Sequence, residues 1–157
     1  MGYARPMQEQ PSIHRTALGA ACAIFDEEGR VLLVHHTYGP LNWELPGGLG
    51  AQGETPDETA TRELLEETGL RAGLDRLTGV YLEPQHDFGP MLHFVFRCRW
   101  DAGQHPVPSS PEVSEVGYFP IDLLPTPISD FTERRIQDAA IDQPVRVGRV
   151  RARRWRG

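Results

Sequence analysis

Hydrophobic residues in this chain fall mostly into short runs of the length of β-strands. Residues 16–25 and 30–36 are two such runs, and the four residues between them, DEEG, are typical of a tight turn. The pattern therefore predicts a β-hairpin at the start of the fold. Further β-rich runs cover residues 77–83, 91–100 and 115–119, and they are expected to complete a mixed sheet.

One segment between these runs has the signals of a helix instead. Thr55 and Glu58 have the spacing of a capping box, and Pro56 stands at the first helical position. Gly69 supplies a stop signal, because glycine commonly ends helices. We expect a helix from about Pro56 to Thr68.

A glycine- and proline-rich segment, residues 37–53, precedes this helix and contains too many turn formers to be helical itself. We expect a functional loop there, with short strands around residues 43–45 and 48–50. Toward the end of the chain, residues 129–141 carry apolar side chains at helical spacing after a Ser or Asp cap. This pattern predicts a second helix, which covers a face of the sheet.

The order of these elements is that of an α/β protein and predicts an α/β/α sandwich with a mixed β-sheet. The length of 157 residues suits one compact domain that needs no disulfide or metal to fold. We divide the chain into a flexible leader, residues 1–15, a globular domain, residues 16–142, and an arginine-rich carboxy-terminal tail, residues 143–157.

The charge distribution limits the partners of the protein. The chain has 16 basic and 22 acidic residues, a formal charge of −6, and every acid occurs by Asp142. A body so acidic repels polyanions through its overall field, unless divalent cations or local arginines reverse the sign at the binding site. The sequence therefore favours metals over nucleic acid. We expect the arginine-rich tail to be solvated and frayed.

No segment predicts export or a membrane. The first 15 residues hold no apolar core of the kind that a secretory signal needs, and the apolar stretches fall far short of the roughly 20 residues that cross a bilayer. The two cysteines, Cys22 and Cys98, lie in apolar stretches, where thiols usually pack as inert core groups. We expect a cytoplasmic protein with free thiols and no membrane partner.

Three glutamates mark the first predicted helix. Glu63, Glu66 and Glu67 stand at positions i, i+3 and i+4, so their carboxylates project from one face within one turn. Such a cluster is either a solvated acidic face or a site for hard cations, which prefer oxygen ligands. The glycine-rich loop favours the second interpretation, because its backbone can bring a phosphate chain close to the acidic face. Magnesium with a phosphate compound fits both observations.

The same segment resembles the signature of the Nudix hydrolases. The family pattern is Gly, five residues, Glu, seven residues, Arg-Glu, an aliphatic residue, any residue, Glu-Glu, any residue, Gly and an aliphatic residue. Every fixed position is matched from Gly48 to Leu70, in GLGAQGETPDETATRELLEETGL. From ordinary residue frequencies, a chance match in one chain is on the order of one in 10⁸. The preceding WELPGG is also similar to the lead-in of many members.

The resemblance implies a Mg²⁺ site, in which Mn²⁺ can substitute, and a role for each matched residue. Arg62 would orient the glutamates by salt bridging, and Glu54 would hold the loop and helix together or take part in metal binding. The metal would polarise a diphosphate and lower the pKa of a bound water, which a carboxylate, Glu66 or Glu67, could deprotonate. Which of the two does so stays open. The implied ligands are the Gly47 carbonyl and the carboxylates of Glu63, Glu66 and Glu67.

Similar proteins often recruit one more acid from a later loop. Glu112 occupies the position that we favour, because it precedes an aromatic strand residue, Tyr118, by six residues. Glu115, Glu83 and Asp87 are the alternatives. We therefore add Glu112 to the expected metal ligands.

The substrate depends on residues outside the signature. The resemblance implies a pyrophosphohydrolase that cleaves a nucleoside diphosphate linked to another moiety, and Pro84, near a proline of many ADP-ribose pyrophosphatases, slightly favours ADP-ribose or nucleotide sugars. The alternatives are a (deoxy)nucleoside triphosphate pyrophosphohydrolase and a non-catalytic nucleotide-sensing domain. Aromatic residues that could stack on a base are Tyr38, Tyr81, Phe88 and Phe131.

Partners other than a small molecule are less strongly indicated. Some similar proteins dimerise through amino-terminal strands, so the segment before Thr16 is compatible with a homodimer and equally with a flexible leader. Binding of RNA by the arginine-rich tail is the least favoured interpretation.

Overall fold

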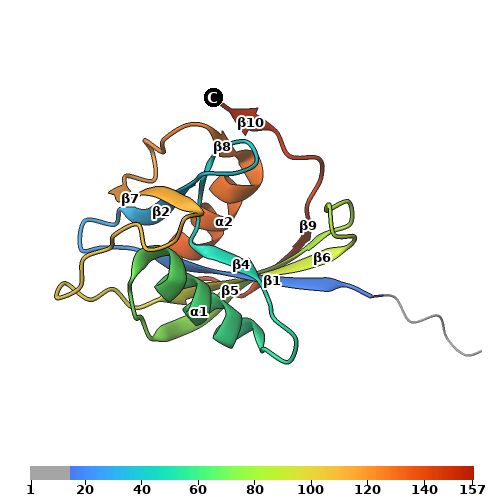
Figure 1. The fold of residues 1–157 in the computed structure, drawn as a ribbon, viewed down its shortest axis with the longest axis horizontal. Helices are drawn as coiled ribbons and strands as arrows, with labels where there is room; N and C mark the ends of the chain where they lie inside the picture. Colours follow the sequence, from blue (N-terminus) through green and yellow to red (C-terminus); the bar gives the residue numbers. More distant parts are fainter. Residues whose placement is uncertain (1–14) are drawn as a thin grey trace, which may run out of the picture.

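The computed structural model describes residues 15–157, which form two mixed five-stranded sheets and two α-helices (Figure 1). The α/β class is confirmed, but the strands are divided between two sheets rather than joined in one. The prediction of a flexible or dimer-forming leader falls almost entirely outside the described residues. None of the helices in residues 15–157 is long and apolar enough to cross a bilayer.

The first sheet contains both long and short strands. In spatial order these are β4 (Gly47–Leu49), β1 (Ala17–Ile24), β6 (Met91–Cys98), β5 (Leu74–Glu83) and β9 (Arg146–Arg149). The second sheet is built from β10 (Trp155–Arg156), β8 (Ile128–Ser129), β3 (Trp43–Glu44), β2 (Val31–His36) and β7 (Val113–Phe119). Each sheet mixes parallel and antiparallel neighbours.

The predicted hairpin of the first two strands is wrong. β1 lies in the first sheet, parallel to β6 along its whole length, whereas β2 lies in the second sheet, antiparallel to β7. Only an isolated bridge between Phe25 and Val31 remains of the expected pairing. The physical reason is that both strands are buried on both faces, so each lies between two partners inside its own sheet. The two strands share one core cluster and so meet face to face between the sheets rather than edge to edge in one sheet.

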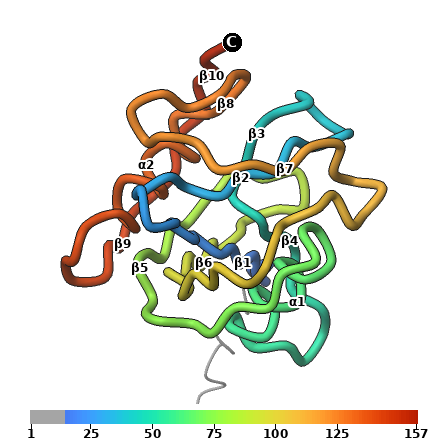
Figure 2. Tube along the Cα trace, turned by 90° about the vertical axis from the view of Figure 1, so that its left-hand side faces the viewer, coloured from blue at the N-terminus to red at the C-terminus, as the bar shows by residue number. Residues whose placement is uncertain are grey.

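Alternation along β1 divides the core into two layers. Ala20 and Cys22 pack toward helix α1 (Pro56–Thr68), while Ala21 and Ala23 pack toward the second sheet and helix α2 (Asp130–Ala140). The two helices therefore lie on opposite faces of the first sheet (Figures 1 and 2). α1 has the bounds that its predicted caps imply.

The arginine-rich end, residues 143–157, is part of the fold rather than a frayed tail. β9 extends the first sheet beside β5, and β10 pairs with β8 in the second sheet. Val150 is buried in the core between them. Acidic partners elsewhere in the chain hold several of its arginines, among them Glu83 with Arg153 and Asp130 with Arg154. These long-range pairings cannot be read from the local composition of the segment.

Candidate functional site

Helix α1 holds the three predicted glutamates at fixed positions. Its amino-terminal end is closed by the capping box, in which the Thr55 N–H donates to Glu58 Oε2 at 2.9 Å. Its carboxy-terminal end is closed by Gly69, whose φ of 72° is left-handed. With both ends fixed, the carboxylates of Glu63 and Glu67 are directed toward strand β4.

Glu67 is the most buried of these glutamates, with a side chain only 3% exposed. Its Oε2 accepts a hydrogen bond from the Gly47 N–H at 2.9 Å, and its Oε1 lies 3.6 Å from His36 Nε2. Burial raises the pKa of Glu67 above its usual value, although the contacts with His36 and Gly47 act in the opposite direction. This carboxylate is thus fixed directly behind the backbone of β4.

Glu63 lies against the next glycine of the same strand. A Cβ atom placed on Gly48 would be 2.6 Å from the Glu63 carboxyl carbon, so only glycine leaves room for this carboxylate. Burial raises the pKa of Glu63 as well, and the neighbouring charges of Glu67 and Glu66 add to that effect. Two carboxylates therefore bracket the Gly47–Gly48 backbone.

Arg62 connects three of the signature acids, a role that the family resemblance implies. Its Nε and Nη2 donate to the two oxygens of Glu54 at 2.6 and 2.9 Å, and its Nη1 donates to Glu63 Oε1 at 2.7 Å and to Glu66 Oε2 at 3.2 Å. Hydrogen bonds from Arg62 hold the pKa of Glu54 at about 2. Glu66 is the outermost member, with its side chain 54% exposed. Glu54 and Arg62 thus tie the loop after β4 to the helix.

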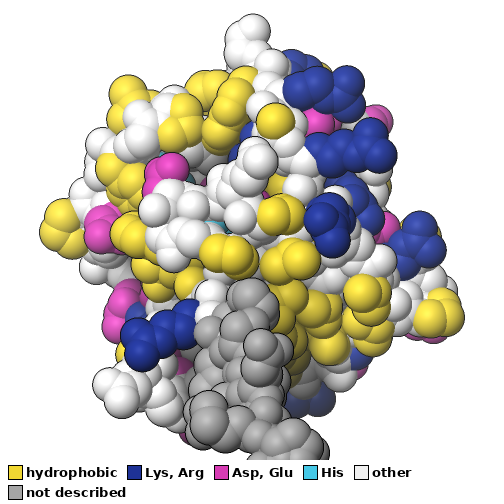
Figure 3. Space-filling view, turned by 90° about the vertical axis from the view of Figure 1, so that its right-hand side faces the viewer, with side chains coloured by type: hydrophobic (Ala, Val, Ile, Leu, Met, Phe, Trp, Pro, Cys, Tyr) yellow, Lys and Arg dark blue, Asp and Glu magenta, His cyan; other side chains and the backbone are white. Residues whose placement is uncertain are grey.

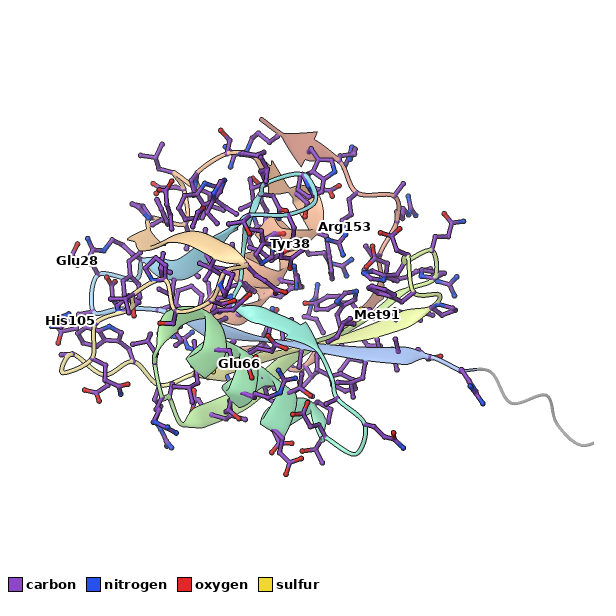
Figure 4. The ribbon with its side chains drawn as sticks, viewed as in Figure 1. Glu28, Tyr38, Glu66, Met91, His105 and Arg153 are labelled. Carbon is purple, nitrogen blue, oxygen red and sulfur yellow. The ribbon has the colours of Figure 1, made fainter. Side chains whose placement is uncertain are left out.

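A cleft of about 790 Å³ opens between the two sheets over this backbone. Glu63, Gly47 and Gly48 line one end of it, and Glu112 reaches the same cleft from the loop before β7. We call this the acidic end, with Glu67 directly behind Gly47. Figure 4 labels Glu66 on α1, below the cleft, and Tyr38 and Arg153 on the side of the second sheet.

Of the three alternatives to Glu112, one lies elsewhere, one is already paired and one shares the cleft. Glu115 is exposed on β7 and is not among the residues that line the cleft. Glu83 lines the cleft, but its carboxylate is engaged by Arg153 and His93. Asp87 lines the cleft in the turn between β5 and β6. Glu112 and Asp87 therefore both stay as candidates for the late-loop acid, and the choice of Glu112 is a proposal.

A second part of the cleft is lined by residues most of which the sequence did not indicate. Arg135 on α2 donates to Glu44 Oε1 at 2.6 Å, and both side chains are almost fully buried. Arg153 donates to both oxygens of Glu83, which also contacts His93 Nε2 at 2.7 Å. All five residues line the cleft, and we call this the arginine end.

The signal for the arginine end was present but incomplete. The arginine-rich composition of residues 143–157 marked the segment as unusual, yet nothing local to it names Glu83 as the partner of Arg153. The sequence indicates Glu83 only as an alternative metal ligand. Its pKa is held at about 2, because hydrogen bonds from His93 and Arg153 outweigh the burial that would raise it.

The four aromatic candidates separate into two groups. Tyr81 and Phe131 are core residues that contact each other edge to face, so they are not available to a ligand. Tyr38 and Phe88 line the cleft. Tyr38 stacks on His36 at 4.7 Å between ring centroids, and burial together with the charges of Glu67 and Glu112 raises the pKa of Tyr38 to about 12.

The carboxylate oxygens of the acidic end are ligands of the kind that hard cations prefer. Among residues 15–157, no three acidic, histidine or cysteine side chains converge tightly enough to hold a metal ion by themselves. The local charge is nevertheless strongly unbalanced, because Arg62 is the cation that pairs with Glu54, Glu63 and Glu66, while Glu67 and Glu112 add two further carboxylates. Oxygen ligands in excess of positive charge are what Mg²⁺ and Mn²⁺ bind.

Comparisons with known proteins identify a family model and several similar chains. A family model described as the NUDIX domain matches residues 15–139. The chain is 31% identical over 137 residues to a MutT-like protein of Streptomyces ambofaciens, covering 87% of this chain and 85% of that protein. It is 31% identical over 122 residues to an ADP-ribose pyrophosphatase of Methanocaldococcus jannaschii, covering 76% of this chain and 70% of that protein.

A solved structure shares the fold. The NUDIX domain of Shewanella oneidensis NrtR, crystallised with ADP ribose, superposes with a TM-score of 0.68 at 19% identity, covering 85% of this chain and 92% of that one. At this identity the likeness concerns the fold alone. The matched family region ends at residue 139, so the segment that carries Arg153 lies beyond it.

Proposed function

Because the chain belongs to the Nudix hydrolase family, we propose that it is a Mg²⁺-dependent pyrophosphohydrolase that cleaves ADP-ribose or a similar nucleotide sugar. The observation that carries this proposal is the pair of carboxylates, Glu63 and Glu67, held against the Gly47–Gly48 backbone on the floor of the cleft. A diphosphate placed over this backbone would lie beside the acids and within a space large enough for both of its substituents.

The acidic end supplies the groups that would hold the metal. When bound, Mg²⁺ or Mn²⁺ neutralises the diphosphate and makes a bound water a better nucleophile. The hydrogen bonds between Arg62 and Glu54 fix the helix relative to the loop. The metal-binding carboxylates of the proposal are therefore ordered before substrate binds. The proposed ligands are the Gly47 carbonyl and the carboxylates of Glu63, Glu66, Glu67 and Glu112.

Glu66 and Glu67 differ in a way that bears on proton transfer. Glu66 is open to solvent, and its Oε2 is shared with Arg62 at 3.2 Å. Glu67 is buried and has one oxygen committed to Gly47. In the proposed reaction one of these two carboxylates accepts a proton from the attacking water, which breaks a phosphorus–oxygen bond of the diphosphate and leaves two phosphomonoesters.

The choice of a nucleotide sugar rests on two supports. One is the similarity to a protein named ADP-ribose pyrophosphatase over most of both chains. The other is the shape of the cleft, which continues from the acidic end to the arginine end, where no excess of positive charge would favour a terminal phosphate. The triphosphate pyrophosphohydrolase and the nucleotide sensor remain the competing functions.

The test is product analysis. The purified protein is incubated with Mg²⁺ and ADP-ribose, nucleotide sugars, nucleoside triphosphates or diadenosine polyphosphates, with EDTA controls, and the products are separated by chromatography. AMP and ribose 5-phosphate from ADP-ribose, formed only without EDTA, are the expected result. Cleavage of triphosphates alone to monophosphate and pyrophosphate would replace the nucleotide-sugar proposal. Binding without turnover, with Mn²⁺ also tried, would favour a sensor.

A further inference from the structure

The carboxy-terminal segment contributes two side chains to the cleft although it lies beyond the matched family region. Arg153 and Trp155 both line the cleft, and Trp155 is 44% exposed there. Figure 3 shows the face of the molecule on which arginine side chains gather along one edge beside exposed hydrophobic groups. This segment is thus placed to meet a ligand whose diphosphate lies at the acidic end.

The segment is anchored on both sides of these residues. The Val150 N–H donates to the Leu82 carbonyl at 2.8 Å. The Asp130 N–H donates to the Arg154 carbonyl at 2.9 Å, and the Arg154 N–H donates back to Asp130 Oδ1 at 3.0 Å. Trp155 is in register with Ser129. The indole is therefore carried by backbone that is fixed before any ligand arrives, which lowers the entropic cost of contact.

The charges at the arginine end favour a neutral ligand group. Arg135 is paired with Glu44, and Arg153 is paired with Glu83, so the two guanidinium charges are balanced by two carboxylates. Burial lowers the pKa of His93, so this ring adds no charge at neutral pH. A phosphate would bring an unbalanced charge here, whereas a planar polar group would not.

Among the exposed aromatics of the cleft, Trp155 is the best placed to receive such a group. Tyr38 is stacked on His36 beside the acidic end, where the diphosphate is expected. Phe88 is 69% exposed in the turn between β5 and β6. Trp155 instead combines a fixed strand with a position next to Arg153, whose guanidinium can donate to ring nitrogen or oxygen atoms.

We propose that Trp155 and Arg153 form the wall of the cleft that binds the nucleobase of the substrate, Trp155 by stacking and Arg153 by hydrogen bonding. The inference deepens the proposed function and rests on it for the identity of the substrate class. It assigns a specificity role to the segment after residue 139, and it predicts that the base-bearing half of the substrate lies at the arginine end.

The experiment compares the two halves of ADP-ribose as separate probes. AMP carries the base and ribose 5-phosphate does not, and neither contains an anhydride bond to cleave. Dissociation constants of both are measured by calorimetry for the wild type, for Trp155→Ala, for Phe88→Ala as the comparison with the rival aromatic of the cleft, and for Leu123→Ala as the surface control outside the cleft. Loss of one stacking partner is expected to weaken AMP binding by at least about tenfold.

The expected pattern is specific to Trp155. AMP binding weakens in Trp155→Ala and is largely restored in Trp155→Phe. The dissociation constant of ribose 5-phosphate in all variants, and that of AMP in Phe88→Ala and Leu123→Ala, stay within about twofold of the wild type. Equal losses for both probes, no loss, absence of AMP binding to the wild type, or a loss in Phe88→Ala instead would each overturn the proposal.

A second measurement, of indole fluorescence, distinguishes loss of stacking from misfolding of Trp155→Ala. AMP is expected to quench indole emission of the wild type, and this change is expected to persist in Trp100→Phe and to vanish in Trp155→Phe. Quenching that survives in Trp155→Phe would contradict the proposal. The hydrolysis assay tests the proposed function separately. If AMP binds through Trp155 but ADP-ribose is not cleaved, the proposed function fails and the role of Trp155 in binding the base is retained. If ADP-ribose is cleaved but substitution of Trp155 does not change AMP binding, the role of Trp155 is refuted.

Discussion

At the scale of single residues, the acidic end depends on carboxylates that the protein buries without balancing their charge. Glu67 is the extreme case, because its side chain is 3% exposed and its neighbours are one backbone N–H and a histidine. Burial of an acid in this way costs stability unless a cation or a proton compensates. Such a cost is typical of a functional group rather than of packing.

Replacement of Glu67 by glutamine tests this argument. The amide oxygen of Glu67→Gln can still accept from the Gly47 N–H, but the proposed anionic metal ligand is lost, so kcat is expected to fall by roughly 100-fold or more. The melting temperature should remain within a few degrees of the wild type, because no core contact is removed. Activity like that of the wild type in this variant would refute the site.

The two candidate acids near β7 give a matched pair. Glu112 lines the cleft, whereas Glu115 is exposed on the strand that follows. Glu112→Gln is expected to lower kcat or to raise the Mg²⁺ concentration for half-maximal rate by about tenfold or more, since one oxygen ligand is weakened. Glu115→Gln should leave both within about twofold. The reverse ranking would transfer the role to Glu115.

Residues of the signature could be predicted from the sequence because their spacing is local. Positions i, i+3 and i+4 of one helix face the same way in any fold, so the grouping of Glu63, Glu66 and Glu67 needs no tertiary information. Arg153 and its partner Glu83 are 70 residues apart, and only the folded sheets bring them together. The arginine end was therefore missed, although its residues were visible in the sequence.

At the scale of elements, the unit that matters is strand β4 packed against helix α1. Gly47 is in register with Ala21 of β1, and a Cβ atom on Gly47 would lie 2.5 Å from the Ala20 carbonyl oxygen. Gly48 faces the other way, toward Glu63. The two glycines are thus required for different reasons, one by the sheet and one by the helix.

The variant Gly48→Ala isolates the second requirement. Its new methyl group would occupy the place of the Glu63 carboxylate, 2.6 Å away, so the carboxylate must move and its bond with Arg62 must change. We expect a loss of kcat of at least about tenfold with a small change in melting temperature, because the flexible end of a side chain yields more easily than backbone. Gly103→Ala, in a distant turn, is the control. Full activity of Gly48→Ala would show that the position of Glu63 is not critical.

Helices and strands differed in how well the sequence predicted them. The bounds of α1 follow from its caps, which act over a few residues. The strands were found as apolar runs, but the pairing of β1 with β6, instead of with β2, joins segments separated by some 70 positions. β1 and β2 are both buried apolar runs, and the runs alone do not show whether two such strands pair edge to edge in one sheet or pack face to face from two sheets.

At the scale of the whole molecule, acid stability reports on the arginine end. Glu83 has a pKa of about 2 in the folded protein, below the value of about 4.3 for an unperturbed glutamate. A carboxylate whose pKa is lower in the folded protein than in the unfolded chain stabilises the fold at pH values above its pKa in the unfolded chain. This stabilisation is lost as the pH falls through its pKa in the folded protein.

The free energy of unfolding should therefore decrease between about pH 5 and pH 2, and Glu83 is expected to contribute on the order of 2 kcal/mol, as hydrogen bonds to a charged group usually do. Denaturant titrations at several pH values measure it. Glu83→Gln is expected to be less stable than the wild type at pH 7 and to converge with it near pH 2. Glu27→Gln, an exposed turn variant, should keep the wild-type slope. A constant difference between Glu83→Gln and the wild type at every pH would contradict the assignment.

The ion pairs of the arginine-rich segment, residues 143–157, show whether it is a free arm for nucleic acid or a part of the fold. As an arm for nucleic acid its arginines would be free, but four of the six are held by acids of this chain, in the pairs Arg146–Asp138, Arg153–Glu83, Arg154–Asp130 and Arg156–Glu133. Because these charges are already neutralised, the segment is better described as a structural wall of the cleft than as a polyanion-binding tail.

Deletion of residues 143–157 tests that description. The deletion removes β9 from beside β5, opens the core at Val150 and leaves Glu83 without its guanidinium partner. Each of the last two losses ordinarily costs about 2 kcal/mol or more, so thermal unfolding should show a melting temperature lower by at least about 10 °C. Arg151→Ala, an exposed change in the same segment, should have no such effect. The description would be wrong if the truncated protein had the same melting temperature as the full chain and lost only a salt-sensitive affinity for RNA. In that case the segment would not be part of the fold, and the cleft would have to select its substrate without Arg153 and Trp155.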